Sequence, residues 1–438
     1  MNGMSHVLKV VLLGLVAATV IAMGVLWFGP MHVKGARNVA HSNGNSDHMR
    51  ALPANEIAER RPSPTAHVAP TQKPSRTDTP VPLRKPSPTA IVTATQSPSV
   101  REAYALGPYT VNGNVILAAD GKPYLFHGIG RDGLEYSCTG DGHFDAQELS
   151  YLGFGTNGSG ITYWGANTVR LPLSEGIWLY GQSSHTCSAA QYQALIKQAV
   201  DALTTLKLNV MLDLQWTDAS RQSLQGGGPW AMPDADSITF WQQVAGIYKS
   251  YSNVLFELFN EPHPASWACW LSACSITDKA SSDDCHCVKT LTFASVGMQA
   301  VVNAVRSTGA TNLVLVAGMD WGFNLSLIGT YRIRGSNVVY DSHPYPYAEK
   351  LPPGWDAAFG NISNTYAVMS AESGEYDCGT SYMSQLLSYF DVHHIGWLAW
   401  AWTVQGAACG YPQLIQDYRG TPVPGMGQLV YARLRGYV

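Results

Sequence analysis

The chain has 438 residues, of which 46% are hydrophobic and 13% are charged, so it is long and apolar enough to bury a large core. Residues 105–438 carry ten more acidic than basic side chains, which argues against a nucleic-acid-binding surface. Residues 31–104 carry five more basic than acidic side chains. Length and charge together suggest one large acidic domain with an N-terminal appendage.

The N-terminal segment is apolar. Val10–Phe28 is a run of 19 residues without a charge, and Lys9 precedes it. That length suits a helix that crosses a bilayer, and it is long for the apolar core of a signal peptide. We expect residues 1–30 to form an uncleaved signal anchor, with a cleaved signal peptide as the alternative. The membrane would then be contacted only through this segment.

The next segment, residues 31–104, has the composition of a linker. It is rich in Pro, Ser and Thr, and the pentapeptide PSPTA occurs at residues 62–66 and again at 86–90. Such a segment cannot bury a core and favours extended polyproline conformations. The composition predicts a disordered, semi-rigid spacer between the membrane and the remaining domain, residues 105–438.

Eight cysteines all fall in predicted loops, at positions 138, 187, 269, 274, 285, 287, 378 and 409. An even number in loops is typical of disulfides in an oxidising compartment, so the large domain should be secreted or face the outside of the cell. The spacing does not fix the pairing. A zinc site made by Cys269, Cys274, Cys285 and Cys287, with or without His286, is the alternative, although their spacing is not a standard zinc pattern.

The folded domain begins near Tyr109 with a hairpin, indicated by the turn signals Asn112-Gly113 and Asp120-Gly121. Eight short apolar strands then alternate with helical patterns. Near-continuous apolar strands with crossovers indicate a parallel sheet buried on both faces, and eight units predict an α/β fold, the (β/α)8 TIM barrel. The predicted strands are 125–129, 167–171, 210–214, 254–259, 313–317, 338–342, 367–371 and 397–401; the predicted helices are 189–206, 238–250, 291–306, 382–392 and 429–434.

Polar and aromatic side chains follow these strands, at the end of the barrel where its chemistry belongs. Two facing carboxylates there can cleave an acetal: one protonates the leaving oxygen, while the other attacks the anomeric carbon or activates water. Their separation decides between retention and inversion, and a sequence gives no distance. The rim candidates are His127, Arg131, Arg170, Asp213, Gln215, Trp216, Asn260, Glu261, Asp320, Trp321, His343, Tyr345, Glu372, Trp400 and Trp402.

The string VLFELFNEPH at residues 254–263 resembles the acid/base strand of glycoside hydrolase family 5, whose barrels carry catalytic glutamates after strands four and seven. The resemblance extends over most of residues 105–438 through GANTVRLP (165–172), VVYDSHPY (338–345), VMSAESGEY (368–376) and GWLAWAW (396–402). It implies a retaining β-glycosidase with Glu261 as general acid/base and Glu372 as nucleophile. An acid protonated near pH 6 beside an ionised nucleophile is the usual division of labour.

The same resemblance implies roles for the neighbouring residues. Asn260 would bind the sugar 2-hydroxyl, and Arg170 and Tyr345 would position the nucleophile and lower its pKa. Each residue also has a structural alternative: Arg170 could be a structural ion pair, and His343 a core histidine. Glu375 is an alternative nucleophile, while Glu135 and Asp320 are interpreted as subsite or structural groups. The remaining substrate-binding candidates are His343, Trp400 (with Trp402 as the alternative sugar platform), Gln215, Trp216 and His127.

Gln215 departs from the family pattern, which usually has histidine at this position. Glutamine donates and accepts hydrogen bonds but carries no charge, so the departure leaves the substrate open. The resemblance points first to endo-β-1,4-glucanase (cellulase), with mannanase, xylanase or exo-β-glucosidase as alternatives. A surface-anchored binding protein without activity is the rival class, and the glutamate pair argues against it. We expect a monomer that acts on polysaccharide without a metal or cofactor. We also expect several tryptophans in or near the predicted rim loops to stack on sugars: Trp164, Trp178, Trp216, Trp230, Trp267, Trp270 and Trp321.

Overall fold

The computed structural model describes residues 104–436, except residues 106, 142, 159, 223–226, 264, 283–286, 378 and 406–410. The predicted anchor and almost all of the predicted linker lie outside the described residues. Within residues 104–436, no helix combines the length and the apolar character needed to cross a membrane.

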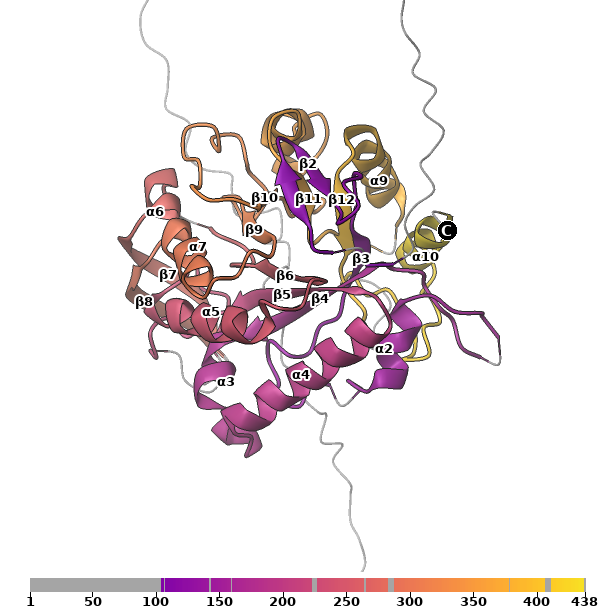
Figure 1. The fold of residues 1–438 in the computed structure, drawn as a ribbon, viewed down its shortest axis with the longest axis horizontal. Helices are drawn as coiled ribbons and strands as arrows, with labels where there is room; N and C mark the ends of the chain where they lie inside the picture. The colour runs from indigo at the N-terminus through magenta and orange to yellow at the C-terminus, as the bar shows by residue number, and fades with distance from the viewer. Residues whose placement is uncertain are drawn as a thin grey trace, which may run out of the picture. The chain divides into compact units, whose positions relative to one another are not determined.

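Eight parallel strands close into a barrel, as predicted (Figure 1). Each strand pairs with its neighbours in chain order, and the last strand, β12, pairs with the first, β3. All eight predicted strands overlap an observed one, with ends that differ by a few residues. The barrel strands are β3 (His127–Gly130), β4 (Thr168–Ser174), β5 (Asn209–Trp216), β6 (Val254–Glu257), β9 (Val314–Ala317), β10 (Val338–Asp341), β11 (Val368–Ser370) and β12 (Gly396–Ala399).

Helices lie around the outside of the barrel. Four of the five predicted helices are present close to their predicted bounds, as α4 (Ala189–Thr205), α5 (Ala235–Tyr248), α9 (Ser381–His393) and α10 (Met426–Gly436). Ser188 begins α4 with a capping box, in which its hydroxyl and the Gln191 side chain satisfy each other's backbone N–H groups. Shorter elements were not predicted: α2 (Ala146–Leu152), α3 (Glu175–Tyr180), α6 (Trp267–Leu271), α8 (Asn361–Ser363), η2 (Ser183–His185), η3 (Ala348–Lys350) and η4 (Asp356–Gly360).

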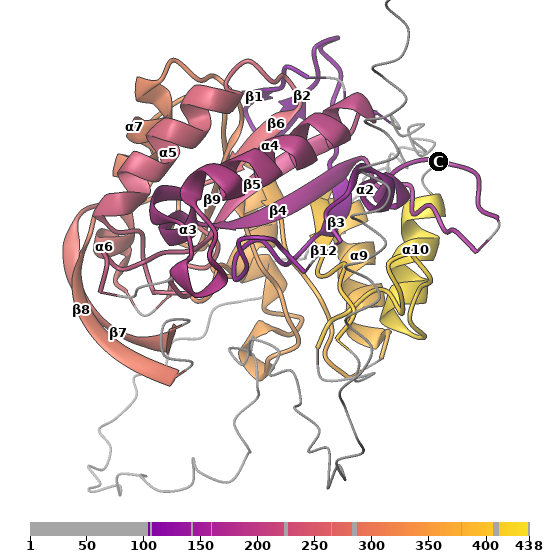
Figure 2. The same cartoon turned by 90° about the horizontal axis from the view of Figure 1, so that it is seen from below.

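The fifth predicted helix, 291–306, is partly wrong. Its first five residues belong to strand β8 (Cys287–Ser295), which pairs antiparallel with β7 (Cys274–Ser282) in a ribbon between α6 and α7 (Met298–Ser307). Leu291, Phe293 and Ser295 are buried and alternate with exposed residues, which is the period of a strand. Figure 2 shows this ribbon curving along the side of the barrel and past its lower end.

A hairpin of β1 (Thr110–Asn112) and β2 (Val115–Leu117) has its turn at Gly113, as predicted from Asn112-Gly113. Figure 2 shows the hairpin at the opposite end from the tip of the ribbon. Tyr109, next to the hairpin, and Ile116 of β2 pack with the side chains that fill the barrel's interior at the hairpin end. That apolar layer comprises Phe126, Met211, Leu255, Leu313, Leu315, Val339, Ala367, Met369, Ala371 and Leu398.

Two disulfides join cysteines of the described residues, Cys138 to Cys187 and Cys269 to Cys274. Cys287 is also disulfide-bonded. The prediction that every cysteine lies in a loop is wrong for Cys269, which is in α6, and for Cys274 and Cys287, which begin the ribbon strands. The alternative zinc site is wrong as well, because two of its four ligands are bonded to each other.

Removing the Cys138–Cys187 disulfide should destabilise the domain more than removing the Cys269–Cys274 disulfide. The first closes a loop with a sequence separation of 49 and the second one of 5. Loop-closure entropy gives about 4 kcal/mol for the longer loop and about 2 kcal/mol for the shorter one. Denaturant unfolding of the two double Cys→Ser variants measures both losses, and an equal or reversed order would contradict the entropic argument.

Candidate active site

The barrel interior changes from apolar to charged towards the C-terminal ends of its strands. Along β6, the inward-facing Leu255 is followed two residues later by Glu257. The same change occurs from Met211 to Asp213 along β5. Glu257 and Asp213 are fully buried. Because side chains alternate along a strand, one step of two residues moves from the core layer into a layer of ionisable groups.

Two glutamates from distant parts of the chain meet above this layer. Glu261 follows β6, Glu372 follows β11, and a carboxylate oxygen of each lies within 4.8 Å of the other and of a His343 nitrogen. Glu372 is 1% exposed and Glu261 is 12% exposed, so Glu261 is the more open to solvent. Retaining glycosidases separate their two carboxyl groups by about 5–5.5 Å, and inverting ones by about 6.5–9.5 Å. The bound of 4.8 Å between one oxygen of each glutamate is close to the shorter of these two ranges.

Two side chains donate hydrogen bonds to the carboxyl group of Glu372. Arg170 donates from Nη1 to Glu372 Oε2 at 2.8 Å, and the Tyr345 hydroxyl donates to Oε1 at 2.7 Å. Arg170 also donates from Nη2 to the side-chain oxygen of Asn260 at 2.7 Å, which fixes the amide beside Glu261. Both oxygens of Glu372 are therefore engaged, and its orientation is set from two sides.

His343 lies next to Glu261. Its Nδ1 is 3.4 Å from Glu261 Oε1, and its Nε2 is 3.0 Å from Asp341 Oδ2 and 3.4 Å from Glu257 Oε1. Burial lowers the pKa of His343, but Asp341 and the other carboxylates outweigh burial and raise that pKa well above its usual range. The imidazole is therefore a cation between three carboxylates.

The order of the two glutamate pKa values in the unliganded site differs from the sequence-based expectation. Burial raises the pKa of Glu261, but the hydrogen bond and charge of His343 outweigh burial and leave that pKa lowered. Burial also raises the pKa of Glu372, and the nearby charge of Glu261 adds to this against the opposing charge of Arg170. The cause is the cation His343, which contacts Glu261 directly.

Of the two predicted tryptophan platforms, only Trp400 lies at the site. Its ring is 5.6 Å from the Arg170 guanidinium and its indole N–H donates to Tyr411 Oη at 2.8 Å. A Cβ at Gly130 would lie 2.4 Å from this ring, so glycine leaves the space that the ring occupies. Trp402 is instead a fully buried core residue whose indole N–H donates to Glu148, which excludes the alternative platform.

The structure places two of the remaining three candidates at the rim. Gln215 and Trp216 end β5 and are partly exposed, and Gln215 Oε1 has no hydrogen-bond partner within the described residues. His127 is not brought to the site, and its prediction is corrected. It begins β3 on the same face as Ile129, towards the helices, with its ring 5.3 Å from that of Trp397.

The structure also shows the surroundings of Glu375, Glu135 and Asp320, the acidic residues that the sequence left as alternatives to the main candidates. Glu375 accepts from the backbone N–H groups of Tyr382 and Met383 in the first turn of α9. Glu135 accepts from the Gly133 N–H at 2.7 Å in its own loop. Asp320 is exposed and has a positive φ of 61°. None of these hydrogen bonds joins Glu375 or Glu135 to Glu261 or Glu372.

Two buried carboxylates in the network were missed by the sequence analysis, Glu257 and Asp341. Each precedes a candidate residue with the same inward orientation: Glu257 comes four residues before Glu261, and Asp341 comes two residues before His343. A charge at an inward position of an otherwise apolar strand was the signal that could have identified both.

Among the residues that the structure describes, three groups of acidic and histidine side chains have ligand atoms close enough to hold a metal ion. Two of them contain His343, whose nitrogens already face carboxylates. The third, Glu175, Asp218 and Asp234, lies between α3, the loop after β5 and the start of α5, and is fully or almost fully buried. Its oxygens accept from the Ser237 hydroxyl and from backbone N–H groups.

This third cluster should make thermal stability depend on pH. Burial, followed by the charge of Asp234, raises the pKa of Asp218 to about 7. The unfolded chain releases this proton near pH 4. Its stabilising effect is therefore complete below about pH 4 and is lost as the pH rises through about 7. We expect the Tm of Asp218→Asn to fall less than that of wild type between pH 5 and pH 8.

At pH 8 the Asp218→Asn variant should melt about 1–2 °C above wild type, as a gain of roughly 1 kcal/mol implies for a domain that spans residues 105–438. Calorimetry across the pH range measures the difference. Asp201→Asn is the matched control, because Asp201 forms an exposed ion pair with Lys197 and should leave the slope unchanged. A wild-type slope in Asp218→Asn would show that Asp218 is ionised in the folded state.

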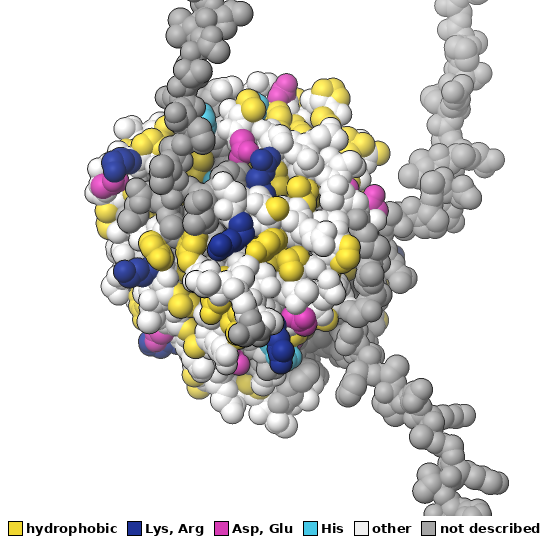
Figure 3. Space-filling view, turned by 90° about the vertical axis from the view of Figure 1, so that its right-hand side faces the viewer, with side chains coloured by type: hydrophobic (Ala, Val, Ile, Leu, Met, Phe, Trp, Pro, Cys, Tyr) yellow, Lys and Arg dark blue, Asp and Glu magenta, His cyan; other side chains and the backbone are white. Residues whose placement is uncertain are grey.

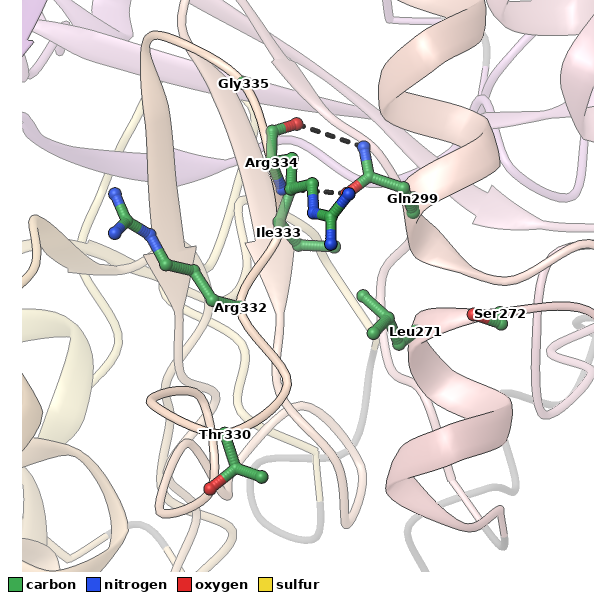
Figure 4. A pocket seen from close by; sticks show the side chains of 8 residues that line it. All are labelled: Leu271, Ser272, Gln299, Thr330, Arg332, Ile333, Arg334 and Gly335. Carbon is green, nitrogen blue, oxygen red and sulfur yellow. Dashed lines mark hydrogen bonds between the residues drawn. The ribbon is translucent and has the colours of Figure 1, made fainter.

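A cavity of about 770 Å³ lies apart from the glutamate pair, between α6, α7 and residues 330–335. Figure 4 shows Gln299 joined to the Arg334 backbone there by two hydrogen bonds, of 2.7 and 3.0 Å. None of the catalytic candidates lines it. On the face shown in Figure 3, charged side chains of both signs are scattered among neutral ones.

Comparison with known protein families shows which family the chain belongs to. The sequence model of the cellulase family, glycosyl hydrolase family 5, matches residues 156–406, more than half of the chain. The chain belongs to glycosyl hydrolase family 5. The match covers barrel strands β4 to β12 and includes Glu261 and Glu372.

Relatives within glycosyl hydrolase family 5 are distant. An endoglucanase of Clostridium saccharobutylicum is 22% identical over 67% of this chain and 57% of its own length. An endoglucanase of Paenibacillus polymyxa is 25% identical over 68% of this chain and 79% of its own length. This chain therefore spans little more than half of the first relative.

Solved structures share the fold. A β-glucanase of Saccharophagus degradans in complex with cellotetraose has a TM-score of 0.57 at 19% identity, covering 78% of this chain and 98% of that one. The catalytic domain of a Thermobifida fusca endoglucanase has a TM-score of 0.54 at 17% identity, covering 75% of this chain and 98% of that one. At these identities the likeness establishes the barrel fold.

Proposed function

We propose that the chain is a retaining β-glycosidase that cleaves internal bonds of a β-1,4-glucan, with Glu372 as nucleophile and Glu261 as general acid/base. The observation that carries the proposal is the pair of carboxylates within 4.8 Å of each other, one of them held from both sides by Arg170 and Tyr345. The names of the relatives, endoglucanases, and the cellotetraose bound by one structural neighbour support a glucan substrate.

In the proposed reaction, Glu372 attacks the anomeric carbon while Glu261 protonates the leaving oxygen. Glu261 then removes a proton from water, which releases the sugar from Glu372 with its configuration retained. Arg170 and Tyr345 stay in contact with Glu372 and favour its ionised form. A bound sugar removes the remaining water from Glu261, which raises the pKa of this carboxyl and prepares it to act as an acid.

The binding groups follow from their positions. Trp400 would lie under the sugar at the cleaved bond, and Asn260 and His343 would line the same subsite. Gln215 and Trp216 lie at the rim, where the partly exposed amide of Gln215 could form a hydrogen bond with a sugar hydroxyl. Partly exposed Trp267 and Trp321 could extend the contact with a chain.

An exo-acting or short-substrate enzyme is the second candidate, because the β7–β8 ribbon packs against the loop of Glu261. Asp278 of the ribbon is 3.6 Å from His263, whose Nδ1 is 2.6 Å from the Glu261 carbonyl oxygen. A ribbon fixed so close to the acid/base could close one end of a cleft. The product pattern on cello-oligosaccharides separates the two candidates.

The test uses the full chain on carboxymethylcellulose, glucomannan and xylan. We expect a rapid fall in the viscosity of carboxymethylcellulose with few reducing ends released, and a β-anomer as the first product by NMR. Faster hydrolysis of glucomannan or xylan than of carboxymethylcellulose would change the assigned substrate to that polysaccharide. An α-anomer as the first product would reject the retaining mechanism. No hydrolysis of any of the three would favour the non-catalytic binding protein.

We further propose that residues 1–30 anchor the chain, that residues 31–104 space the domain from the membrane, and that the domain is an extracellular monomer. The apolar run Val10–Phe28, the repeated PSPTA and the disulfides support this. Membrane fractionation of the full chain with and without residues 1–30 tests the anchor. Light scattering of the soluble form tests the monomer.

A further inference from the structure

Glu257, at the end of β6, occupies the centre of the charged layer beneath the two glutamates. It is fully buried and faces inwards. Its carboxylate accepts from Arg170 Nε at 2.6 Å and from Arg170 Nη2 at 2.8 Å, in a bidentate pair. Its Oε1 also lies 3.4 Å from His343 Nε2. Such a pair fixes the plane of the guanidinium as well as its position.

The two cations that Glu257 contacts serve different glutamates. Arg170 uses Nη1 to hold Glu372, and His343 presents Nδ1 to Glu261. Each cation has a second carboxyl group of its own, Asp213 at 2.9 Å from Arg170 and Asp341 at 3.0 Å from His343. Within the described part of the chain, only Glu257 forms ion pairs with both cations.

We propose that Glu257 is a positioning residue that couples the acid/base Glu261 to the nucleophile Glu372, by fixing Arg170 and His343 with one shared carboxylate. The proposal rests on the function proposed above and adds a residue to it. Glu257 acts through Arg170 and His343 rather than on the sugar, because it lies below both glutamates in the closed interior of the barrel.

The charge balance of the network supports this role. Five carboxyl groups share two cations, so their protons cannot be distributed evenly. Burial raises the pKa of Glu257, but Arg170 and His343 outweigh burial and hold that pKa at about 2. Burial instead leaves the pKa of Asp213 and of Asp341 raised. The groups that face the network are Arg170, Asp213, Glu261, His263, Asp341, His343, Tyr345, Lys350, Glu372, Tyr376 and, beside Arg170, Glu135.

Glu257→Gln tests the proposal, because it keeps the side-chain shape and removes one negative charge. On an aryl β-cellobioside, kcat should fall about 10- to 100-fold with KM within about threefold of wild type, since misplaced groups lose rate and no sugar contact is lost. Loss of the anion makes the remaining groups release protons more readily. Both limbs of the pH profile should therefore move about one unit towards acid.

Asp213→Asn and Asp341→Asn are the matched controls. Each variant removes a carboxyl group that contacts only one of the two cations, Arg170 or His343. Because the pKa values of Asp213 and Asp341 are raised, little negative charge is lost. Both limbs of the pH profile should therefore stay in place. A wild-type rate in Glu257→Gln, a lower rate with unmoved limbs, or an equal shift of the limbs in either control would overturn the proposal.

Two further measurements keep the test decisive. If Glu257→Gln does not fold, Glu257→Asp replaces it, because aspartate keeps the charge but withdraws it by one methylene. We then expect kcat to fall at least about tenfold while both limbs of the pH profile stay in place. Wild-type turnover in Glu257→Asp would overturn the proposal. NMR titration of the His343 ring, assigned with His343→Gln, needs no turnover. A lowered pKa in Glu257→Gln supports the coupling even if the wild-type chain hydrolyses no glucan, and an unchanged pKa overturns it.

Discussion

Replacing Glu372 with Gln should lower kcat about 10⁴-fold or more on any substrate that the wild-type chain hydrolyses. Glutamine keeps the shape and can still accept from Tyr345, but it loses the charge paired with Arg170 and cannot form the glycosyl ester. Turnover on carboxymethylcellulose and on an aryl β-cellobioside measures the loss. The Tm should change little, since the packing around position 372 is unaltered.

Glu375→Gln is the matched control, three residues along the same loop. Glu375 accepts two backbone N–H groups at the start of α9, so its replacement should lower stability by about 1 kcal/mol and leave kcat near wild type. If Glu375→Gln abolished turnover and Glu372→Gln did not, the nucleophile would have to be reassigned to Glu375.

The barrel was predictable because its strands are buried on both faces. In β6, Val254 and Phe256 pack outwards against the helices while Leu255 packs inwards, so the strand reads as a continuous apolar run. The chain order of such runs then determines a parallel closed sheet. The ribbon β7–β8 was missed because its strands are exposed on one face and carry Ser, Thr and Lys, which resemble a loop in sequence.

Tryptophan positions were the least predictable part of the site. Trp164, Trp178, Trp230 and Trp270 are buried, and three of their indole N–H groups donate to oxygens of Gly420, Gln243 and Ala317. Only Trp216, Trp267 and Trp321 of the seven candidates are partly exposed. A tryptophan in a loop suits a sugar platform and a core position equally, because both uses need an apolar face and a partner for the N–H.

The proton distribution could not be predicted from the sequence either. It depends on Asp341, which contacts His343, and on Glu257, which reaches Arg170 and His343 only after strands β4, β6 and β10 have been brought together. Motif residues such as Asn260-Glu261 identify the chemistry, but the charge of His343 sets which glutamate has the higher pKa in the unliganded site. Distances between residues far apart in the chain therefore decide what the motifs leave open.

Replacing Glu261 with Ala should lower turnover by an amount that depends on the leaving group. An acid is needed only where the departing oxygen is a poor leaving group, so hydrolysis of cello-oligosaccharides should fall about 10²- to 10⁴-fold. From a dinitrophenyl cellobioside, dinitrophenolate departs without being protonated. Formation of the glycosyl ester on Glu372 should therefore be nearly as fast as in wild type. Pre-steady-state release of dinitrophenol measures this step.

The second half of the reaction supplies the control. Without Glu261, water is no longer deprotonated as it attacks, so the ester on Glu372 should accumulate and a burst of dinitrophenol should precede slow turnover. Azide, which needs no base, should restore the rate and give a β-glycosyl azide, because it enters on the face that the leaving group vacated. Equal loss on good and poor leaving groups, without a burst, would show that Glu261 positions the sugar rather than transferring a proton. An α-azide would place the nucleophile elsewhere.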